Sequence, residues 1–239
     1  MDYEEINYRI DSRERELNAS LAFPVLMRKV YSWMSLALVI TALAAYGVAN
    51  SQSMVNILYS NSAIMWVLIG AELALVIGLS AAINKLSLPV ATLMFVAYSL
   101  INGVTLSSIF FIYDIGSIGT VFLITAATFA AMSVYGYFTK TDLTSMGKIM
   151  VMALIGIIIA TVVNLFMKSE GLNLILSYLG VLVFVGLTAY DTQRIKEMFL
   201  QAPDASESVQ KYALLGALTL YLDFINLFLY LLRIFGKRE

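Results

Sequence analysis

The stretch YALLGALTLYLDFINLFLYLLRIF, from Tyr212 to Phe235, decides what kind of protein this sequence encodes. It is apolar over more than the roughly 20 residues that cross a bilayer as a helix. One acid, Asp223, lies near its middle, and a second, Asp191, closes the preceding apolar run in VGLTAYDTQRIK. Because an ionisable group at membrane depth is costly unless it is paired or hydrated, these acids indicate a functional site.

The composition of the whole chain agrees with that stretch. Hydrophobic residues make up 60% of the 239 residues and charged residues 13%, whereas soluble domains have about 45–50% and about 25%. The net charge of −1 gives no reason to expect a nucleic-acid partner. Cys and His are both absent, which excludes disulfides, thiolate chemistry and histidine-based zinc binding or proton sensing. Proton sensing would therefore have to rest on carboxylates.

Seven apolar segments are long enough to span a membrane, and most connections between them are short. The sequence predicts an all-α, polytopic membrane protein with seven transmembrane helices over residues 30–239. A polar, cytoplasmic tail over residues 1–29 precedes them and lacks the pattern of a cleavable signal peptide. The predicted spans are Tyr31–Ala49, Ala63–Ile83, Pro89–Tyr113, Ser117–Phe138, Met146–Met167, Leu172–Tyr190 and Tyr212–Phe235.

Lysine and arginine predict the orientation, because cytoplasmic segments carry the excess of positive charge. With the N-terminus inside, eleven Lys and Arg side chains fall in inner segments and four in outer ones. The N-terminus is therefore expected in the cytoplasm. Seven spans then place the basic tail GKRE (236–239) outside, whereas a re-entrant segment would return it to the inside.

Polar residues of the last span recur at steps of three and four, which places them on one face of a helix. Such sorting is typical of a helix that is surrounded by others and whose polar face borders a hydrated path. The alternative is a packing seam, with small residues for close approach and Asn as a link between helices. The face consists of Gly216, Thr219, Asp223, Asn226, Tyr230 and Arg233.

The sixth span shows a shorter stripe that ends at Asp191. Asp223 lies 11 residues past Tyr212, about 16 Å along the axis at about 1.5 Å per residue. Asp191 is thus expected nearer the cytoplasm, and the two acids meet only if the inner end of the sixth span dips into the bundle. The alternative for Asp191 is a solvated residue or a cap at the end of a helix.

A third acid, Glu72, lies in WVLIGAELALVIGLS in the outer half of the second span. Arg233 lies at the outer end of the last span, at a compatible depth, so a Glu72–Arg233 ion pair is one hypothesis. The alternative is that Arg233 extends alone to the outer headgroups.

The segments LTAYDTQRIK and YLDFINLFLYLLR resemble the signature of the Bax inhibitor-1 family, and the likeness extends over all seven spans. The resemblance implies a last helix that is central and surrounded by the other six. It implies a calcium leak that acid favours, with Asp191 and Asp223 as the proton-sensing pair, and it matches Glu72 and Arg233 to an acid and an arginine of the family. Some bacterial members carry an arginine at the inner part of the second span, but GLSAAINK has none here, and Lys85 is the nearest cation.

Two carboxylates in one low-dielectric site share a proton more readily than they both stay charged. Together with this shared proton, the resemblance implies a pH-sensitive calcium leak channel, gated by Asp191 and Asp223 between the sixth and seventh spans. The same pair would bind calcium weakly and transiently, with Thr219, Asn226 and Tyr230 along the ion pathway. No cofactor is expected apart from calcium as the permeant ion; the expected partners are the lipid bilayer, protons and, as an option, other membrane proteins.

Two other functions stay open: a proton-coupled cation transporter, and a regulatory membrane protein that acts through interactions without any flux of its own. An intramembrane aspartyl protease is disfavoured. Tyr190 and Asp191 fit half of its motif, but the last span has no GxGD or PAL sequence, so no enzymatic activity is expected. The short tail favours the inner membrane of a bacterial cell.

Overall fold

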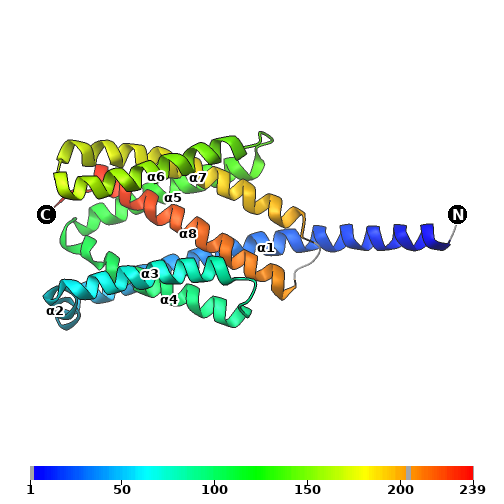
Figure 1. Cartoon of the computed structure of the whole chain (residues 1–239), viewed down its shortest axis with the longest axis horizontal. Coiled ribbons are helices and arrows are strands. Elements are labelled where there is room, and N and C mark those ends of the chain that lie inside the picture. The colour runs from blue at the N-terminus through cyan, green and yellow to red at the C-terminus, as the bar shows by residue number, and fades with distance from the viewer. Residues whose placement is uncertain (1–2, 203–205, 239) are drawn as a thin grey trace.

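The computed structural model describes residues 3–202 and 206–238, with side chains from residue 21 onward, and this part of the chain is helical (Figure 1). One isolated antiparallel bridge joins Tyr113 to Arg238. The helices are α1 Tyr3–Ala49, α2 Gln52–Ser60, α3 Ser62–Ala82, α4 Leu88–Leu106, η1 Ser107–Phe111, α5 Ile115–Phe138, α6 Thr144–Met167, α7 Glu170–Leu200 and α8 Glu207–Phe235.

Within the described residues, seven helical segments have the length and composition to cross a membrane, which confirms the predicted number of spans. They are Leu21–Ala49, Ser62–Ala82, Leu88–Phe111, Ile115–Phe138, Thr144–Met167, Glu170–Leu200 and Glu207–Phe235. The start of α1 and the end of α8 lie at opposite ends of the long axis (Figure 1), as an odd number of full spans requires.

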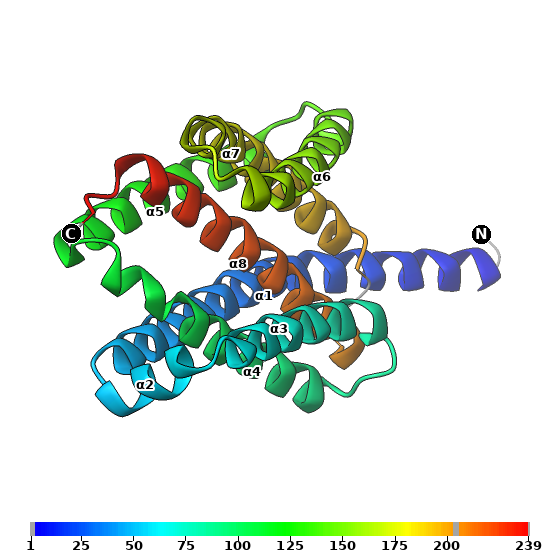
Figure 2. The same ribbon diagram turned by 60° about the vertical axis from the view of Figure 1, so that its left-hand side comes forward.

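The last helix, α8, is central, as predicted. It crosses the middle of the bundle and packs against α1, α4, α5 and α7 (Figures 1 and 2). In the most apolar stretch of α8, 67% of the residues are buried inside the bundle. The corresponding shares are 6% for α3 and 11% for α6, so those two helices form the outer wall.

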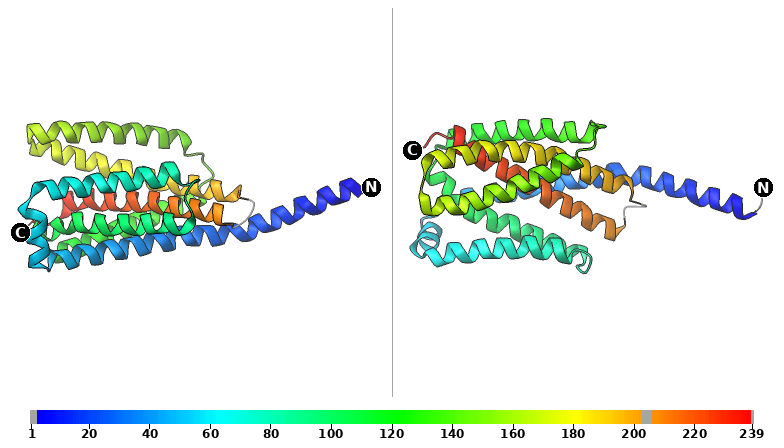
Figure 3. Two further views of the ribbon diagram at one scale, coloured as in Figure 1. Left: turned by 60° about the horizontal axis from the view of Figure 1, so that its bottom comes forward. Right: turned by 45° about the horizontal axis from the view of Figure 1, so that its top comes forward.

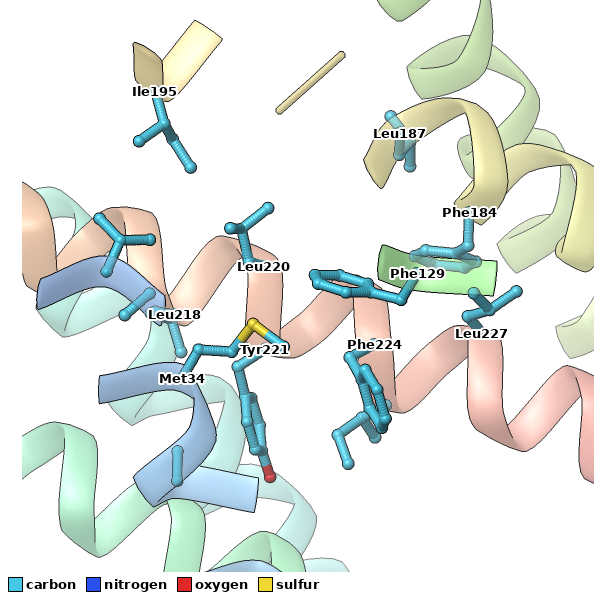
Figure 4. Close-up of a cluster of buried hydrophobic side chains, with 14 of the residues drawn as sticks. Met34, Phe129, Phe184, Leu187, Ile195, Leu218, Leu220, Tyr221, Phe224 and Leu227 are labelled. Carbon is cyan, nitrogen blue, oxygen red and sulfur yellow. The ribbon is translucent and has the colours of Figure 1, made fainter. Parts of the chain in front are cut away.

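The core forms around α8, as the close-up in Figure 4 shows. Tyr221 and Phe224 of α8 meet Met34 of α1 and Phe129 of α5 within one cluster of buried side chains. Phe129 and Phe224 make an edge-on ring contact with centroids 5.5 Å apart. Aromatic burial thus fixes α8 between the first and fifth helices.

Side chains of the connections set where the helices begin. Asp114 accepts a hydrogen bond from the Ser117 N–H at the start of α5, and Ser169 accepts one from the Leu172 N–H at the start of α7. These bonds satisfy backbone donors that a first helical turn leaves free. Between α6 and α7, Lys168 adopts a left-handed conformation with φ of 51°, which ends α6 in a tight turn.

The C-terminal tail is held against the connection between η1 and α5. The Asp114 N–H donates to the Lys237 carbonyl oxygen over 3.0 Å, and the Lys237 N–H donates to Ser117 Oγ over 2.8 Å. This attachment keeps the tail at the end of the bundle opposite the N-terminus (Figure 1).

Three predicted boundaries were wrong. The first helix does not begin at Tyr31, because α1 is continuous from Tyr3 and its Ala22, Leu26 and Met27 are buried in the core. The bundle therefore begins before residue 30. The short helix α2 was read as a connection. The helix α7 does not end at Tyr190 but continues to Leu200, which changes the position of Asp191.

Candidate functional site

The helices α7 and α8 run antiparallel in close contact, and small residues allow the approach (Figure 3). At one end Ile195 packs against Gly216, where an added Cβ would lie 3.3 Å from Ile195 Cδ1. At the other end a Cβ on Gly180 would lie 2.6 Å from the Tyr230 ring. Glycine is thus needed at position 180, and the two contacts fix the register that brings Asp191 close to Asp223.

Asp191 and Asp223 lie next to each other and interact through their carboxyl groups. Asp191 is 9% exposed and Asp223 is 4% exposed. Asp223 Oδ2 is buried, and no described residue forms a hydrogen bond with it. A buried, unpaired carboxylate oxygen is costly, which is typical of a group kept for function.

The sequence placed Asp191 and Asp223 at different depths in the membrane, but in the structure they meet. Asp191 is neither a helix cap nor a solvated end residue, because α7 continues for nine residues beyond it. The two acids therefore meet between two helix interiors, and no dipping of the sixth span is needed.

The acidic pair lines a cavity of about 520 Å³ between α3, α6, α7 and α8. Three predicted pathway residues of α8, Thr219, Asn226 and Tyr230, line the same cavity. Asn226 Nδ2 donates to the Leu222 carbonyl oxygen over 2.8 Å, which leaves the Asn226 side-chain oxygen for the cavity. By contrast, a cavity of about 490 Å³ between α1 and α5 has no carboxylate in its lining.

Glu72 also lines the acidic cavity, but the predicted Glu72–Arg233 ion pair is not formed. Glu72 accepts hydrogen bonds from Thr105 Oγ1 over 2.7 Å and from Asn102 Nδ2 over 3.4 Å. The Arg233 side chain is exposed, with its guanidinium carbon 5.3 Å from the Tyr230 ring centre. Two neutral donors on α4 therefore replace the arginine as partners of Glu72.

A hydrogen-bonded network on the other side of α8 was missed from the sequence. The Tyr221 hydroxyl, fully buried, lies 2.7 Å from Thr41 Oγ1 and donates to Asn102 Oδ1 over 2.9 Å. Asn102 in turn reaches Glu72, so the network connects α1, α3, α4 and α8. The available signal was the hydroxyl itself, since a buried Tyr usually needs a polar partner.

The residues around Asp191 fasten α7 to α5 and to the α5–α6 connection. The Ala189 backbone packs against Gly136 of α5, and Thr192 Oγ1 donates to Ser133 Oγ over 3.4 Å. Gln193 holds the α5–α6 connection through both ends of its amide. It accepts from the Leu143 N–H over 2.8 Å and donates to the Thr141 carbonyl oxygen over 2.9 Å. In the sequence DTQ, Asp191 is thus the acid of the pair, and Thr192 and Gln193 bind neighbouring elements.

The cation that acts on Asp191 is Arg194, one turn further along α7. Lys85, which the sequence suggested as the nearest cation, is exposed in the α3–α4 connection. Local helical spacing brings Arg194 and Asp191 onto neighbouring positions, and the Arg194 side chain is exposed.

Fold and site together define a seven-helix membrane protein with an aspartate pair buried beside its central helix. Residues 24–239 match the family described as "Inhibitor of apoptosis-promoting Bax1", so the chain belongs to the Bax inhibitor-1 family. It is 54% identical to "Inner membrane protein YbhL" of Escherichia coli strain K12 over 89% of this chain and 92% of that protein. It is 38% identical to an uncharacterized membrane protein of Streptococcus pyogenes serotype M1, over 88% of this chain and 92% of that one.

Proposed function

We propose that this protein is a calcium leak channel whose Asp191–Asp223 pair senses protons and gates the path. The observation that carries the proposal is the pair itself: two buried carboxyl groups in one cavity, with Asp223 Oδ2 unpaired. A bundle core that needed only packing would not keep two acids together, because their burial is costly.

The oxygen atoms of the site suit calcium in a transient way. Calcium takes about six to eight oxygen ligands, and the cavity offers carboxylates together with the oxygens of Thr219 and Asn226. The described residues contain no group of three or more His, Cys, Asp or Glu side chains placed to hold a metal ion. Water would have to complete the shell, so the ion would bind weakly and could leave again.

The pair also supplies a proton-dependent switch. One shared proton discharges part of the pair and weakens both the attraction of Asp191 to Arg194 and the attraction of the site for calcium. The state that binds more protons becomes more populated as pH falls. If the open state is the protonated one, acid increases flux, and we expect this sign.

The membrane setting of the proposal is the inner membrane of a bacterial cell, with the N-terminus in the cytoplasm. The printed name of the Escherichia coli relative places that protein in the inner membrane. We propose no enzymatic activity, because the sequence lacks the GxGD and PAL motifs of an intramembrane aspartyl protease.

The test is calcium efflux from liposomes that contain the purified protein, measured against pH. Efflux should rise on acidification, and replacing both Asp191→Asn and Asp223→Asn should remove that dependence. Glu197→Gln, which removes an exposed carboxylate from the same helix α7, is the matched control and should keep it. An unaltered pH profile in the double variant would refute the sensor. Saturable uptake with fixed proton stoichiometry would point to a coupled transporter, and absence of any flux to an interaction protein.

A further inference from the structure

The acidic cavity is larger and more apolar than a path for calcium alone would need. Its volume of about 520 Å³ lies within the range of about 300–1,000 Å³ that is usual for small-molecule sites. More than half of its lining is Leu, Val, Ile, Phe or Tyr. A hydrated metal ion gains nothing from such walls, whereas the apolar part of an organic molecule does.

Charged groups enter this apolar cavity from two sides. Glu72 lies on the α3 side, and Asp191 and Asp223 lie on the α7–α8 side. Asp223 Oδ2 is buried and has no hydrogen-bond partner among the described residues. The ring of Tyr230 is stacked on Phe184 with centroids 5.9 Å apart and has the Arg233 guanidinium carbon 5.3 Å from its centre, so it adds an aromatic wall to the cavity.

The mouth of the cavity faces the bilayer. Leu73 of α3 and Ile158 of α6 line it and are 59% and 55% exposed. Both residues lie near the middle of their membrane-spanning helices, Ser62–Ala82 and Thr144–Met167. A molecule that enters between α3 and α6 would therefore come from the hydrocarbon region rather than from water.

We propose that this cavity is a binding site for a monovalent organic cation with an apolar body, which enters from the lipid between α3 and α6. Its ammonium group lies among Glu72, Asp191 and Asp223, and its apolar body rests on the aliphatic and aromatic walls. The charge of the carboxylates excludes anions of the same shape, and the apolar mouth disfavours strongly hydrated ions. The proposal concerns binding and holds whether or not calcium passes.

The experiment uses the full chain in nanodiscs of zwitterionic lipid, so that no lipid charge recruits the probe. Binding of benzyltrimethylammonium is measured by saturation-transfer NMR, with empty nanodiscs as background. Its neutral isostere neopentylbenzene has the same shape with carbon in place of the charged nitrogen. The cation should bind in a saturable way, and the isostere should bind at least roughly tenfold more weakly, because the Coulomb attraction to the carboxylates is lost.

Four variants locate the site. Glu72→Gln and Asp223→Asn should each weaken binding of the cation about tenfold. Glu197→Gln, an exposed carboxylate elsewhere on α7, should leave it unchanged. Ile158→Trp adds bulk at the mouth on a lipid-facing position and should also weaken binding; it carries the test if a charge variant does not fold.

Three results would overturn the proposal: equal binding of cation and isostere, binding that Glu72→Gln and Ile158→Trp do not alter, or no binding above empty nanodiscs. Failure of the calcium assay is a separate outcome. A protein that binds the cation but shows no calcium efflux keeps this site and loses the proposed channel function.

Discussion

A methyl group added at Gly136 tests the contact on which the acidic pair depends. Gly136 of α5 is buried against the backbone of Ala189, two residues before Asp191. An added Cβ would overlap the Ala189 carbonyl oxygen and lie 2.9 Å from its carbon, where ordinary contact begins at 3.4 Å. The neighbour is backbone, so no side chain can rotate away, and α5 and α7 must separate by about one ångström to relieve the overlap with the carbonyl oxygen.

The size of the effect follows from two opposing terms. Overpacking a tight contact costs about 1–3 kcal/mol, and replacing a helical glycine by alanine returns about 0.5–1 kcal/mol. Gly136→Ala should therefore destabilise the fold by about 1–2 kcal/mol. For a chain of this length that corresponds to a decrease in Tm of about 2–8 °C.

Two glycines serve as matched controls. Gly119, on the same helix, and Gly156, on α6, would meet nothing within 4 Å of an added Cβ. Gly119→Ala and Gly156→Ala should leave Tm unchanged or raise it, because only the conformational term acts. Thermal unfolding of the purified protein in detergent compares the three variants. If Gly136→Ala is as stable as Gly119→Ala, the close approach of α5 and α7 is refuted.

Three further predictions concern the polar contacts. Gln193→Ala should lower the free energy of unfolding by about 2–3 kcal/mol, because it leaves the buried Leu143 N–H without a partner. Hydrogen exchange in the α5–α6 connection should become faster. An unchanged rate would contradict the contact. Tyr221→Phe removes a buried hydroxyl that is hydrogen-bonded to Thr41 and Asn102, and thermal unfolding should show a loss of stability of about 1–3 kcal/mol. Tyr178→Phe, at an exposed position, should leave the stability unchanged. Hydrogen bonds from Thr144 lower the pKa of Asp142 below its usual range. The hydrogen bond from the Thr144 N–H to Asp142 at the start of α6 should thus persist at neutral pH and disappear only as pH falls through the lowered pKa. Asp142→Asn should not change the pH profile of calcium efflux near neutrality.

Helical periodicity was enough to predict which residues of α8 lie together on one side of the helix. Thr219, Asp223, Asn226 and Tyr230 share one face by spacing, and all four line the cavity. The end members of the predicted stripe do something else: Gly216 receives Ile195, and Arg233 is exposed. Spacing along one helix defines a face, but what each position meets depends on the neighbouring helix.

The end of α7 could not be predicted from hydropathy. The run DTQRIKEMFL looks polar enough for a connection, yet Ile195 and Phe199 are buried while Arg194 and Glu197 face outward. The helix changes from apolar on all sides to amphipathic, so a window that averages hydropathy ends it too early. That error alone had placed Asp191 at a helix end and separated it from Asp223.

The partner of Glu72 could not be derived from depth and charge. An arginine at a compatible depth was the simplest complement, but an acid in a bundle can also be satisfied by neutral donors. Thr105 and Asn102 share a face of α4 and supply those donors. The choice between an ion pair and neutral donors depends on which helix lies beside α3, and that is a tertiary fact.

The contacts of α8 indicate which half of the bundle would move when the pair changes charge. Tyr221 and Asp223 are two residues apart, about 200° around the helix, and therefore point to nearly opposite sides. On the Tyr221 side, buried hydrogen bonds join α8 to α1 and α4. On the Asp223 side, α8 meets α7 through packing and the acidic pair, without a hydrogen bond to Asp223 Oδ2. A change of charge at the pair therefore acts on a contact that is held by packing rather than by hydrogen bonds, and α7 is the element we expect to shift. Because Gln193 joins α7 to the α5–α6 connection, that connection should move with it and report the state of a pair buried on the other side of the helix.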